Sequence, residues 1–405
     1  MARKIDLDSI PQDWKYDLLD KFAVRCSGHT PSQSYPEYWN GGIKWISLAD
    51  SRRLDSGYIF ETDKEISEEG LKNSSAELHP AETVVLSRDA GIGKSAVMSA
   101  PMAVSQHFIA WKCDNTAKLH SWFLYNWLQL NKTEFERQAV GSTIKTIGLP
   151  YFKKLKIAVP PFSEQKTIAQ ILSTWDQAIT ATEQLLANSQ QQKKALMQQL
   201  LTGKKRLLDE NGVAFSGEWL YFELKDVAKI TMGSSPKSEA YNECQTGLPL
   251  IQGNADIKNR FSYPRIYTTE ITKECMPNDI LLSVRAPVGN IALSKHNACI
   301  GRGIAAIKAN KVNFQGFLYQ LLLWMEPRWS AFSQGSTFES INSDDIKRLK
   351  LKIPAQEEQT KIAIVLSTAD QEIEALQKKL AYLKQEKKAL MQQLLTGKRR
   401  VKVEG

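Results

Sequence analysis

The sequence predicts an α+β protein of two related halves, in which two globular domains are joined and spaced by two long helices paired as an antiparallel coiled coil. Three observations support this fold class. The chain of 405 residues contains an internal duplication, two long stretches are rich in helix formers, and the remaining segments mix short strands with short helices. The composition, 42% hydrophobic and 24% charged, is typical of a folded protein and excludes global disorder.

The duplication is clearest in two tails. The segment KKALMQQLLTGK occurs at 193–204 and again at 387–398, and more than half of the positions in 160–204 are identical in 354–398. Such self-similarity indicates two copies of one structural unit. We therefore expect a pseudo-two-fold relation between the copies.

The similarity continues, more weakly, upstream of the tails. VLSRDAGIGKSA at 85–96 aligns with LLSVRAPVGNIA at 281–292, and GSTIKTI at 141–147 aligns with GSTFESI at 335–341. The segment IPQDW near the N-terminus resembles the FSGEW that opens the second copy. Each copy is thus a variable globular part followed by a nearly invariant tail, and the two ends of the chain are expected to lie close together.

Both globular parts are expected to combine strands and helices. The strand candidates are apolar or alternating stretches bounded by glycine, proline or aspartate, at 43–47, 84–87, 103–113, 248–252, 280–284 and 304–309. A helix is expected at 117–130 and its counterpart at 315–325.

Each tail is predicted to be one long helix. Between 163 and 202 there is no glycine or proline, and good helix formers dominate. Ser163 can cap the helix, and Glu164 lies where the helix dipole favours a carboxylate. Gly203 and Gly397 suit the position just after a helix end. About forty residues at a rise of ~1.5 Å would form a rod of roughly 60 Å.

The apolar residues of the tails recur with the 3.5-residue period of a coiled coil, so the two helices are expected to pack on each other. The expected packing residues are Ile168, Leu172, Trp175, Ile179, Leu186, Leu196, Leu200, Ile362, Leu366, Ile373, Leu380, Leu390 and Leu394. Lys193 and Lys387 interrupt this seam at equivalent positions. A polar seam residue can fix the register, or its long stem can reach past the seam to water.

The net charge of +9, from 53 Lys+Arg against 44 Asp+Glu, favours a polyanionic partner. Polar side chains in turns of both globular parts could hold phosphates or read base edges. The candidate DNA-binding residues are Ser47, Arg88, Lys94, Gln106, Ser142, Thr143, Lys145, Gln252, Asn254, Arg285, Asn290, Arg302, Ser336 and Thr337. For the two GST turns, simple chain reversal is an equal interpretation.

No motif predicts catalysis or a metal site. AGIGKS at 90–95 is not a phosphate-binding loop, because Arg88 stands where the first glycine is needed. VPPF at 159–162 has Val159 where an amino-methyltransferase loop needs an amide or acid. Five scattered cysteines and five histidines without ligand spacing predict neither a disulfide framework nor bound zinc.

No transmembrane segment is predicted either. The longest apolar runs, such as 318–325, are far shorter than the ~20 residues that a spanning helix needs. The N-terminus lacks the apolar core of a secretion signal, so we expect a cytoplasmic protein.

Together these features resemble the specificity (S) subunit of type I restriction–modification systems. The resemblance spans the chain and is carried by motifs that occur twice in the same order. They are the ALMQQLLTGK helix ends, the GST turns and the residues at each helix start, Pro160, Glu164 and Gln165 in one copy and Pro354, Glu358 and Gln359 in the other.

The resemblance implies that 1–160 is one target recognition domain and that 205–354 holds a linker and the second. It implies that 161–204 and 355–405 are conserved spacer helices, the latter with a basic tail. Each recognition domain would read one half of a split site in double-stranded DNA. This chain would then be the non-catalytic subunit of the complex.

The partners implied by the resemblance are two modification (M) subunits and two restriction (R) subunits. S-adenosylmethionine would be bound by M, which methylates adenine N6, and ATP and Mg²⁺ would be used by R, so that this chain itself binds no cofactor. Exposed glutamines at the helix ends are candidates for contact with M, although they could be ordinary solvated surface: Gln198, Gln199, Gln392 and Gln393.

A coiled-coil scaffold whose globular domains bind other proteins would share the duplication and the rod. The ordered recurrence of the motifs favours the DNA-specificity subunit. DNA binding with a steep dependence on salt would distinguish the two, because it reports the number of phosphates that are neutralised. The sequence also leaves open an orphan subunit that serves methylation without restriction.

Overall fold

The computed structural model describes residues 10–113, 118–141, 145–332 and 340–402. The chain forms two compact units. Unit 1 comprises Met1–Glu183 with Lys379–Gly405, and unit 2 comprises Gln184–Lys378. Two long helices, α5 (Phe162–Leu200) and α9 (Gln356–Leu394), therefore each contribute one half to each unit.

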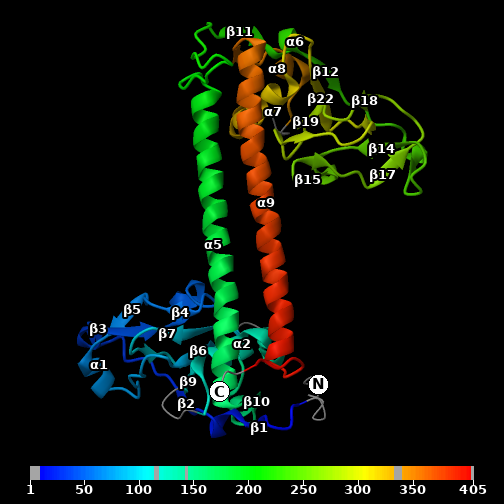
Figure 1. Cartoon of the computed structure of the whole chain (residues 1–405). Coiled ribbons are helices and arrows are strands. Elements are labelled where there is room, and N and C mark those ends of the chain that lie inside the picture. Colours follow the sequence, from blue (N-terminus) through cyan, green and yellow to red (C-terminus); the bar gives the residue numbers. More distant parts are fainter. Residues whose placement is uncertain (1–9, 114–117, 142–144, 333–339, 403–405) are drawn as a thin grey trace. The chain divides into compact units, whose positions relative to one another are not determined.

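The described residues of unit 1 form three sheets and four short α-helices besides the halves of α5 and α9 (Figure 1). The five-stranded sheet has the order β2-β9-β6-β7-β4, with bounds Val24–Ser27, Phe108–Lys112, Val84–Ser87, Ser95–Met98 and Tyr58–Ile59. The other two sheets are β5-β3-β8 (Lys64–Ile66, Trp39–Ile46, Ala103–Val104) and β1-β10 (Lys15–Leu18, Lys156–Val159). The helices are α1 (Glu68–Lys72), α2 (Ser121–Leu130), α3 (Lys132–Gln138) and α4 (Leu149–Lys153).

Unit 2 is built in the same way around two larger sheets. The first has the order β12-β22-β19-β20-β16-β15, with bounds Ala228–Met232, Ile304–Ala309, Ile280–Ser283, Ile291–Leu293, Phe261–Ser262 and Ile257–Lys258. The second is β13-β17-β14-β21-β18 (Tyr241–Asn242, Ile266–Thr268, Leu248–Ile251, Ala298–Ile300, Glu274–Cys275), and β11 pairs with β23 (Leu220–Glu223, Lys350–Ile353). The short helices are α6 (Leu224–Val227), α7 (Gln315–Phe332) and α8 (Ser343–Lys347).

The mixed strand and helix content confirms the predicted α+β class, and most predicted elements occur with shifted ends. The predicted strand at 103–113 is wrong as one element, because a turn at 105–107 divides it into β8 and β9. The predicted cap at Ser163 is also wrong. The amide of Gln165 already bonds the carbonyl of Pro161 at 3.1 Å, so α5 begins before Ser163 and encloses it.

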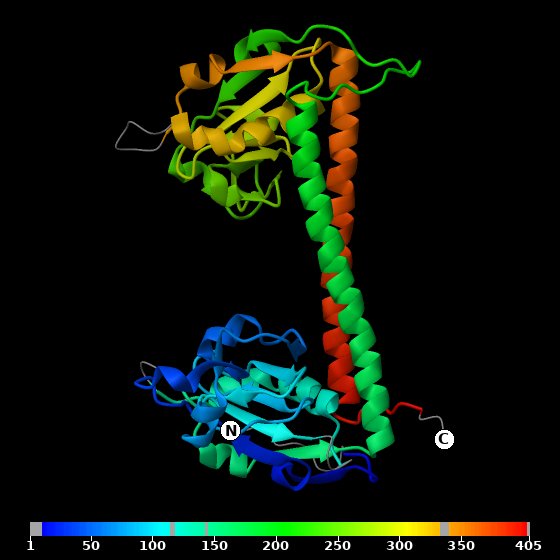
Figure 2. The same cartoon turned by 90° about the vertical axis from the view of Figure 1, so that its left-hand side faces the viewer.

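The core of each unit is completed by the ends of both long helices. In unit 1, α2 lies along β6 and β7 (Figure 2), and fully buried Phe123 packs in one cluster with Ile168 from α5 and Leu394 from α9. In unit 2, Phe317 of α7 shares a cluster with Leu200 and Ile362. Burying these apolar side chains anchors the helices to the sheets.

The helices pair antiparallel inside each unit. In unit 1, Lys387 Nζ lies 2.5 Å from Asp176 Oδ1, and in unit 2 the equivalent Lys193 lies 2.5 Å from Asp370 Oδ1. Lys193 is 9% exposed, and its ammonium pairs with an aspartate of the facing helix. This contact favours the register interpretation of the seam lysines over the interpretation in which the stem reaches water.

The expected packing residues of the seam are buried or half-buried. Ile168, Leu172, Leu200, Ile362, Leu366 and Leu394 are buried, and Trp175, Ile179, Leu186, Leu196, Ile373, Leu380 and Leu390 are half-buried. The fully buried members lie near the helix ends, where the sheets cover them.

A buried carboxylate seats the start of each long helix. Glu164, 2% exposed, accepts two bonds of 2.7 Å from Arg400 and one of 3.3 Å from Trp14 Nε1. In unit 2, Glu358 accepts the same three bonds from Arg206 and Trp219. Each arginine follows the end of the other long helix. The start of α5 is therefore bound to the end of α9, and the start of α9 to the end of α5.

The same contact brings the two ends of the chain together in unit 1. Arg400 also binds the Asp13 carboxylate at 2.6 and 2.7 Å. Gly397 has φ of +74°, and a Cβ there would lie 2.4 Å from Pro11 Cδ. The expected proximity of the N-terminal and C-terminal segments is therefore confirmed for the described residues of unit 1.

We predict that Arg400→Ala destabilises unit 1 by about 3 kcal/mol, because Glu164 is left buried without its cation. The neighbouring exposed Arg399 is the matched control, since its side chain forms no ion pair among the described residues. Urea unfolding of the full chain measures both variants. Equal losses for Arg400→Ala and Arg399→Ala would contradict the assigned role.

Candidate nucleic-acid interface

A polar hollow of about 530 Å³ opens on unit 2 where four loops meet. It brings together four residues that the sequence singled out, Gln252, Asn254, Arg285 and Arg302. The rest of the lining is Ser235, Pro236, Ser238, Tyr241, Gly253, Ala286 and Gly303. The sequence analysis missed these residues because they come from loops without a periodic pattern.

The loop that carries Arg285 is held rigidly. The amide of Ser283 bonds the carbonyl of Asn290 at 3.0 Å, the amide of Gly289 bonds the carbonyl of Ser283 at 2.9 Å, and the Ser283 hydroxyl donates to the Pro287 carbonyl at 2.8 Å. Arg285 stands exposed on this turn. A fixed turn places its guanidinium without the entropy cost of ordering a loose loop.

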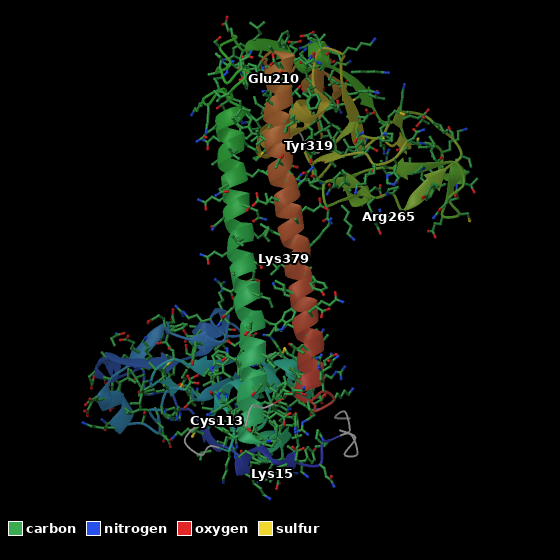
Figure 3. The ribbon with its side chains drawn as sticks, in the orientation of Figure 1. Lys15, Cys113, Glu210, Arg265, Tyr319 and Lys379 are labelled. Atoms are coloured by element: carbon green, nitrogen blue, oxygen red, sulfur yellow. The ribbon has the colours of Figure 1, made fainter. Side chains whose placement is uncertain are left out.

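The segment that carries Gln252 is held by Asp256, at the end of a short helix at Asn254–Asp256. One carboxylate oxygen of Asp256 accepts the amide of Gln252 at 2.9 Å, and the other pairs with Arg265 Nε at 3.1 Å. Arg265 is labelled in Figure 3, at the lower side of unit 2 in that view. The fixed main chain leaves the Gln252 side chain at the hollow.

Two arginines line this hollow. Arg285 and Arg302 are both exposed, and in the described part of unit 2 neither forms an ion pair. The amide of Arg302 is fixed by the Ser235 hydroxyl at 3.2 Å. Two unpaired guanidiniums beside amide side chains favour a ligand with anionic and hydrogen-bonding groups.

Asn290 differs from the other candidates because its amide is used internally. It donates to Asn254 Oδ1 and accepts from Arg260 at 2.9 Å. Asn290 therefore does not line the hollow. Its contacts support the loop that carries Arg285.

Unit 1 repeats several backbone bonds of this scaffold. The amide of Ser87 bonds the carbonyl of Lys94 at 2.8 Å, and the amide of Gly93 bonds that of Ser87 at 3.0 Å, as in the Ser283 turn. The amide of Ser105 bonds the carbonyl of Ile46 at 2.9 Å, as the amide of Gly301 bonds that of Ile251. Equivalent positions in the two units can therefore be assigned from the backbone.

The side chains at these equivalent positions differ. Asp89 stands in place of Arg285, Gln106 in place of Arg302, and Ser47 in place of Gln252. Asp89 is buried, accepts from the Thr146 hydroxyl and lies 2.5 Å from His107 Nδ1. Unit 1 thus presents a less basic surface on the same backbone.

Two candidates of unit 1 are turned inward. Ser47 is 8% exposed, and its hydroxyl caps the short helix at Leu48–Arg52 by accepting the amide of Ala49 at 3.3 Å. Arg88 is half-buried beside Asp89, at 3.7 Å. In this arrangement Ser47 supports a loop, and Gln106 remains exposed and accepts from Thr30.

A second hollow, of about 410 Å³, lies on unit 1 and is lined by lysines. It joins the predicted Lys94 and Lys145 to Lys132 and Glu136. Lys94 Nζ donates to the Ser51 carbonyl at 2.8 Å, and Lys132 pairs with Asp55 at 2.6 Å. Lys145 is exposed and forms no ion pair among the described residues of unit 1, so it is the cation most accessible to a ligand.

Four candidates cannot be placed. Ser142, Thr143, Ser336 and Thr337 lie outside the described residues.

The four candidate M-contact glutamines, Gln198, Gln199, Gln392 and Gln393, are all exposed on the last turns of α5 and α9. In the described residues, no helix is long and apolar enough to cross a membrane.

These observations define a class of protein, a duplicated binding protein whose two heads share a backbone scaffold and present different polar surfaces. Comparison with known proteins makes the class specific. The family model "Type I restriction modification DNA specificity domain" matches residues 11–188 and again 216–385. The chain belongs to this family and is the specificity subunit of a type I restriction–modification system, a non-catalytic subunit of that complex.

One curated relative matches nearly the whole length of the chain, and another matches less than half of it. The "Putative type I restriction enzyme MjaX specificity subunit" of Methanocaldococcus jannaschii is 30% identical over 99% of this chain and 97% of its own. The EcoR124I/EcoR124II specificity subunit of Escherichia coli is 28% identical over 40% of this chain and 41% of its own.

Two solved structures share the fold. The S subunit from M. genitalium has a TM-score of 0.62 at 16% identity and covers 95% of this chain and 96% of its own. A chain from a structure of type I R-M complex assembly and conformational transition has a TM-score of 0.60 at 23% identity, with coverage of 96% and 99%.

Proposed function

We propose that each head reads one half of a bipartite site in double-stranded DNA, with one target recognition domain at 1–160 and a linker and the second domain at 205–354. The observation that carries the proposal is a shared hydrogen-bonded scaffold with different side chains at equivalent positions. Exposed Arg285 and Arg302 of unit 2 stand where unit 1 has the buried Asp89 and the exposed Gln106. A shared scaffold places both readers alike, and different side chains select different base edges.

The hollow of unit 2 is proposed as the main readout surface of the second domain. Arginine binds guanine edges in the major groove, and glutamine and asparagine pair with adenine. Arg285, Arg302 and Gln252 line the hollow from fixed loops, so they supply both kinds of donor. In the first domain, Lys94 and Lys145 at the lysine-lined hollow are proposed to contact phosphates.

The long helices are proposed to set the unread spacer between the half-sites and to dock two M subunits. The two helices carry nearly the same sequence, and Gln198, Gln199, Gln392 and Gln393 are exposed at their ends. Two copies of M need two equivalent surfaces, whereas two half-sites need different ones. This requirement explains why the tails are alike and the heads diverge.

The assembled complex would methylate adenine N6 through M and cleave DNA through two R subunits, in the cytoplasm. S-adenosylmethionine would be bound by M, and ATP and Mg²⁺ by R. This chain would contribute only the choice of site. A protein-binding scaffold remains the competing function, and an M complex that is soluble but leaves DNA unmethylated would favour it.

The decisive experiment is methylation mapping. The chain is co-expressed with its neighbouring M subunit in a methylation-free host, and modified bases are detected by sequencing. We expect methyladenine in both halves of one split motif. Exchanging 219–354 for the corresponding head of a related subunit should change one half and preserve the other. A change in both halves would contradict the proposal that each head reads one half-site.

We further predict that Arg285→Ala and Arg302→Ala each weaken specific DNA binding by the M complex, by about 1–3 kcal/mol, and relax its base specificity. The loss of base specificity should be confined to the half-site that the second head reads. Lys347→Ala on α8 is the matched control, because this exposed lysine lies outside the hollow. If all three variants weakened binding to both half-sites equally, net charge alone would explain the effect, and the proposed base contacts would be wrong.

A further inference from the structure

Unit 1 holds a cluster of metal-ligand side chains that the DNA-reading surface does not use. Cys26 lies on β2, the edge strand of the five-stranded sheet, and Glu77 and His79 come from the segment before β6. One ligand atom of each residue lies within 4.8 Å of those of the other two. Cys26 is about fifty residues from Glu77 and His79 in the sequence, so their spacing gave no signal of a site.

His79 makes this cluster more than a chance grouping. Its side chain is fully buried, and neither ring nitrogen has a hydrogen-bond partner among the described residues. A buried imidazole ordinarily donates from one nitrogen and accepts at the other. Both nitrogens of the His79 ring are therefore unsatisfied, and the ring lies beside a thiol and a carboxylate.

His79 cannot reach another partner by moving its backbone. Its amide bonds the Met102 carbonyl at 2.9 Å, and the Met102 amide returns the bond at 3.0 Å. Cys26 is fixed as well, since β2 pairs with β9 and places Cys26 opposite Ala110. Two of the three ligands are thus preorganised on paired backbone.

We propose that Cys26, Glu77 and His79 bind a divalent ion of the zinc class. Thiolate sulfur, imidazole nitrogen and carboxylate oxygen are the ligands that zinc takes, and three protein ligands leave a fourth position for water. Calcium and magnesium prefer oxygen ligands and fit this set poorly. On binding, the Cys26 thiol releases its proton to solvent, and the sulfur donates to the metal.

Lys112 opposes metal binding in the structure as described. It lies on β9, and its Nζ is 3.7 Å from Glu77 Oε2. This ammonium must leave Glu77 when a dication enters, because like charges repel at that distance. Lys112 is partly exposed and can swing into solvent.

The second unit lacks the ligand set at the equivalent positions. Thr231 pairs with Ala306 as Cys26 pairs with Ala110, and Cys275 pairs with Ala298 as His79 pairs with Met102. Lys273 precedes Cys275 as Glu77 precedes His79. The bound metal would tie β2 to the 77–79 segment in unit 1 alone. β2 leads to Thr30, which bonds Gln106, so the ion would stiffen one reader and not the other.

The test is a Co²⁺ titration of the full chain after removal of metals with a chelator. We expect one equivalent to bind with thiolate-to-cobalt charge-transfer absorption, and Zn²⁺ to displace it. Cys26→Ser should abolish this absorption and weaken binding by at least about tenfold, since even indirect ligand partners cost that much. Cys244→Ser, an exposed cysteine of unit 2, is the matched control and should leave both unchanged.

Two further variants keep the result interpretable. Glu77→Gln changes an exposed side chain and should weaken binding without unfolding the chain. Lys112→Met removes the competing cation and should strengthen binding several-fold. Absence of the charge-transfer absorption in the folded wild-type chain, or its persistence in Cys26→Ser, overturns the proposal. Unchanged affinity in both Glu77→Gln and Lys112→Met would exclude Glu77 as a ligand.

Discussion

A buried glutamate at the start of each long helix is the constraint on which the rest of the structure depends. Glu164 and Glu358 are almost fully buried, and a carboxylate in such a place requires charged and hydrogen-bonded partners. Those partners are a tryptophan that precedes the first strand of the same copy and an arginine that follows the other copy's helix. Neither unit is therefore complete without residues from both copies of the duplication.

The lysine–aspartate pairs also join the two copies of the repeat, farther along the helices. Lys193 with Asp370 and Lys387 with Asp176 are related by the repeat, so the same seam residue finds the same partner in each unit. In unit 2, Asp370 also accepts from Gln320 of α7 at 2.8 Å, which connects the helix pair to the head. A polar contact inside an apolar seam fixes its register, because any slip would leave a buried ammonium unpaired.

The two heads combine one backbone scaffold with two different sets of exposed side chains. The backbone bonds around the Ser87 and Ser283 turns are the same, so the loops beyond them are placed alike. The exposed residues on those loops are free to differ because they support no core packing. The proposed reading of a bipartite DNA site would explain this divergence, since two different half-sites require two different readers.

The sequence by itself determined the duplication, the α+β class, the two long helices and the family, because heptad periodicity and repeated motifs are local in the chain. It also named four residues of the unit 2 hollow from their chemical type. Only the tertiary structure decided that Ser47 is a buried cap, that Asn290 supports a loop, and that Arg206 and Arg400 seat the opposite helices. It alone brought Cys26, Glu77 and His79 together. These features arise from strand pairing and burial between segments far apart in sequence, which no local pattern encodes.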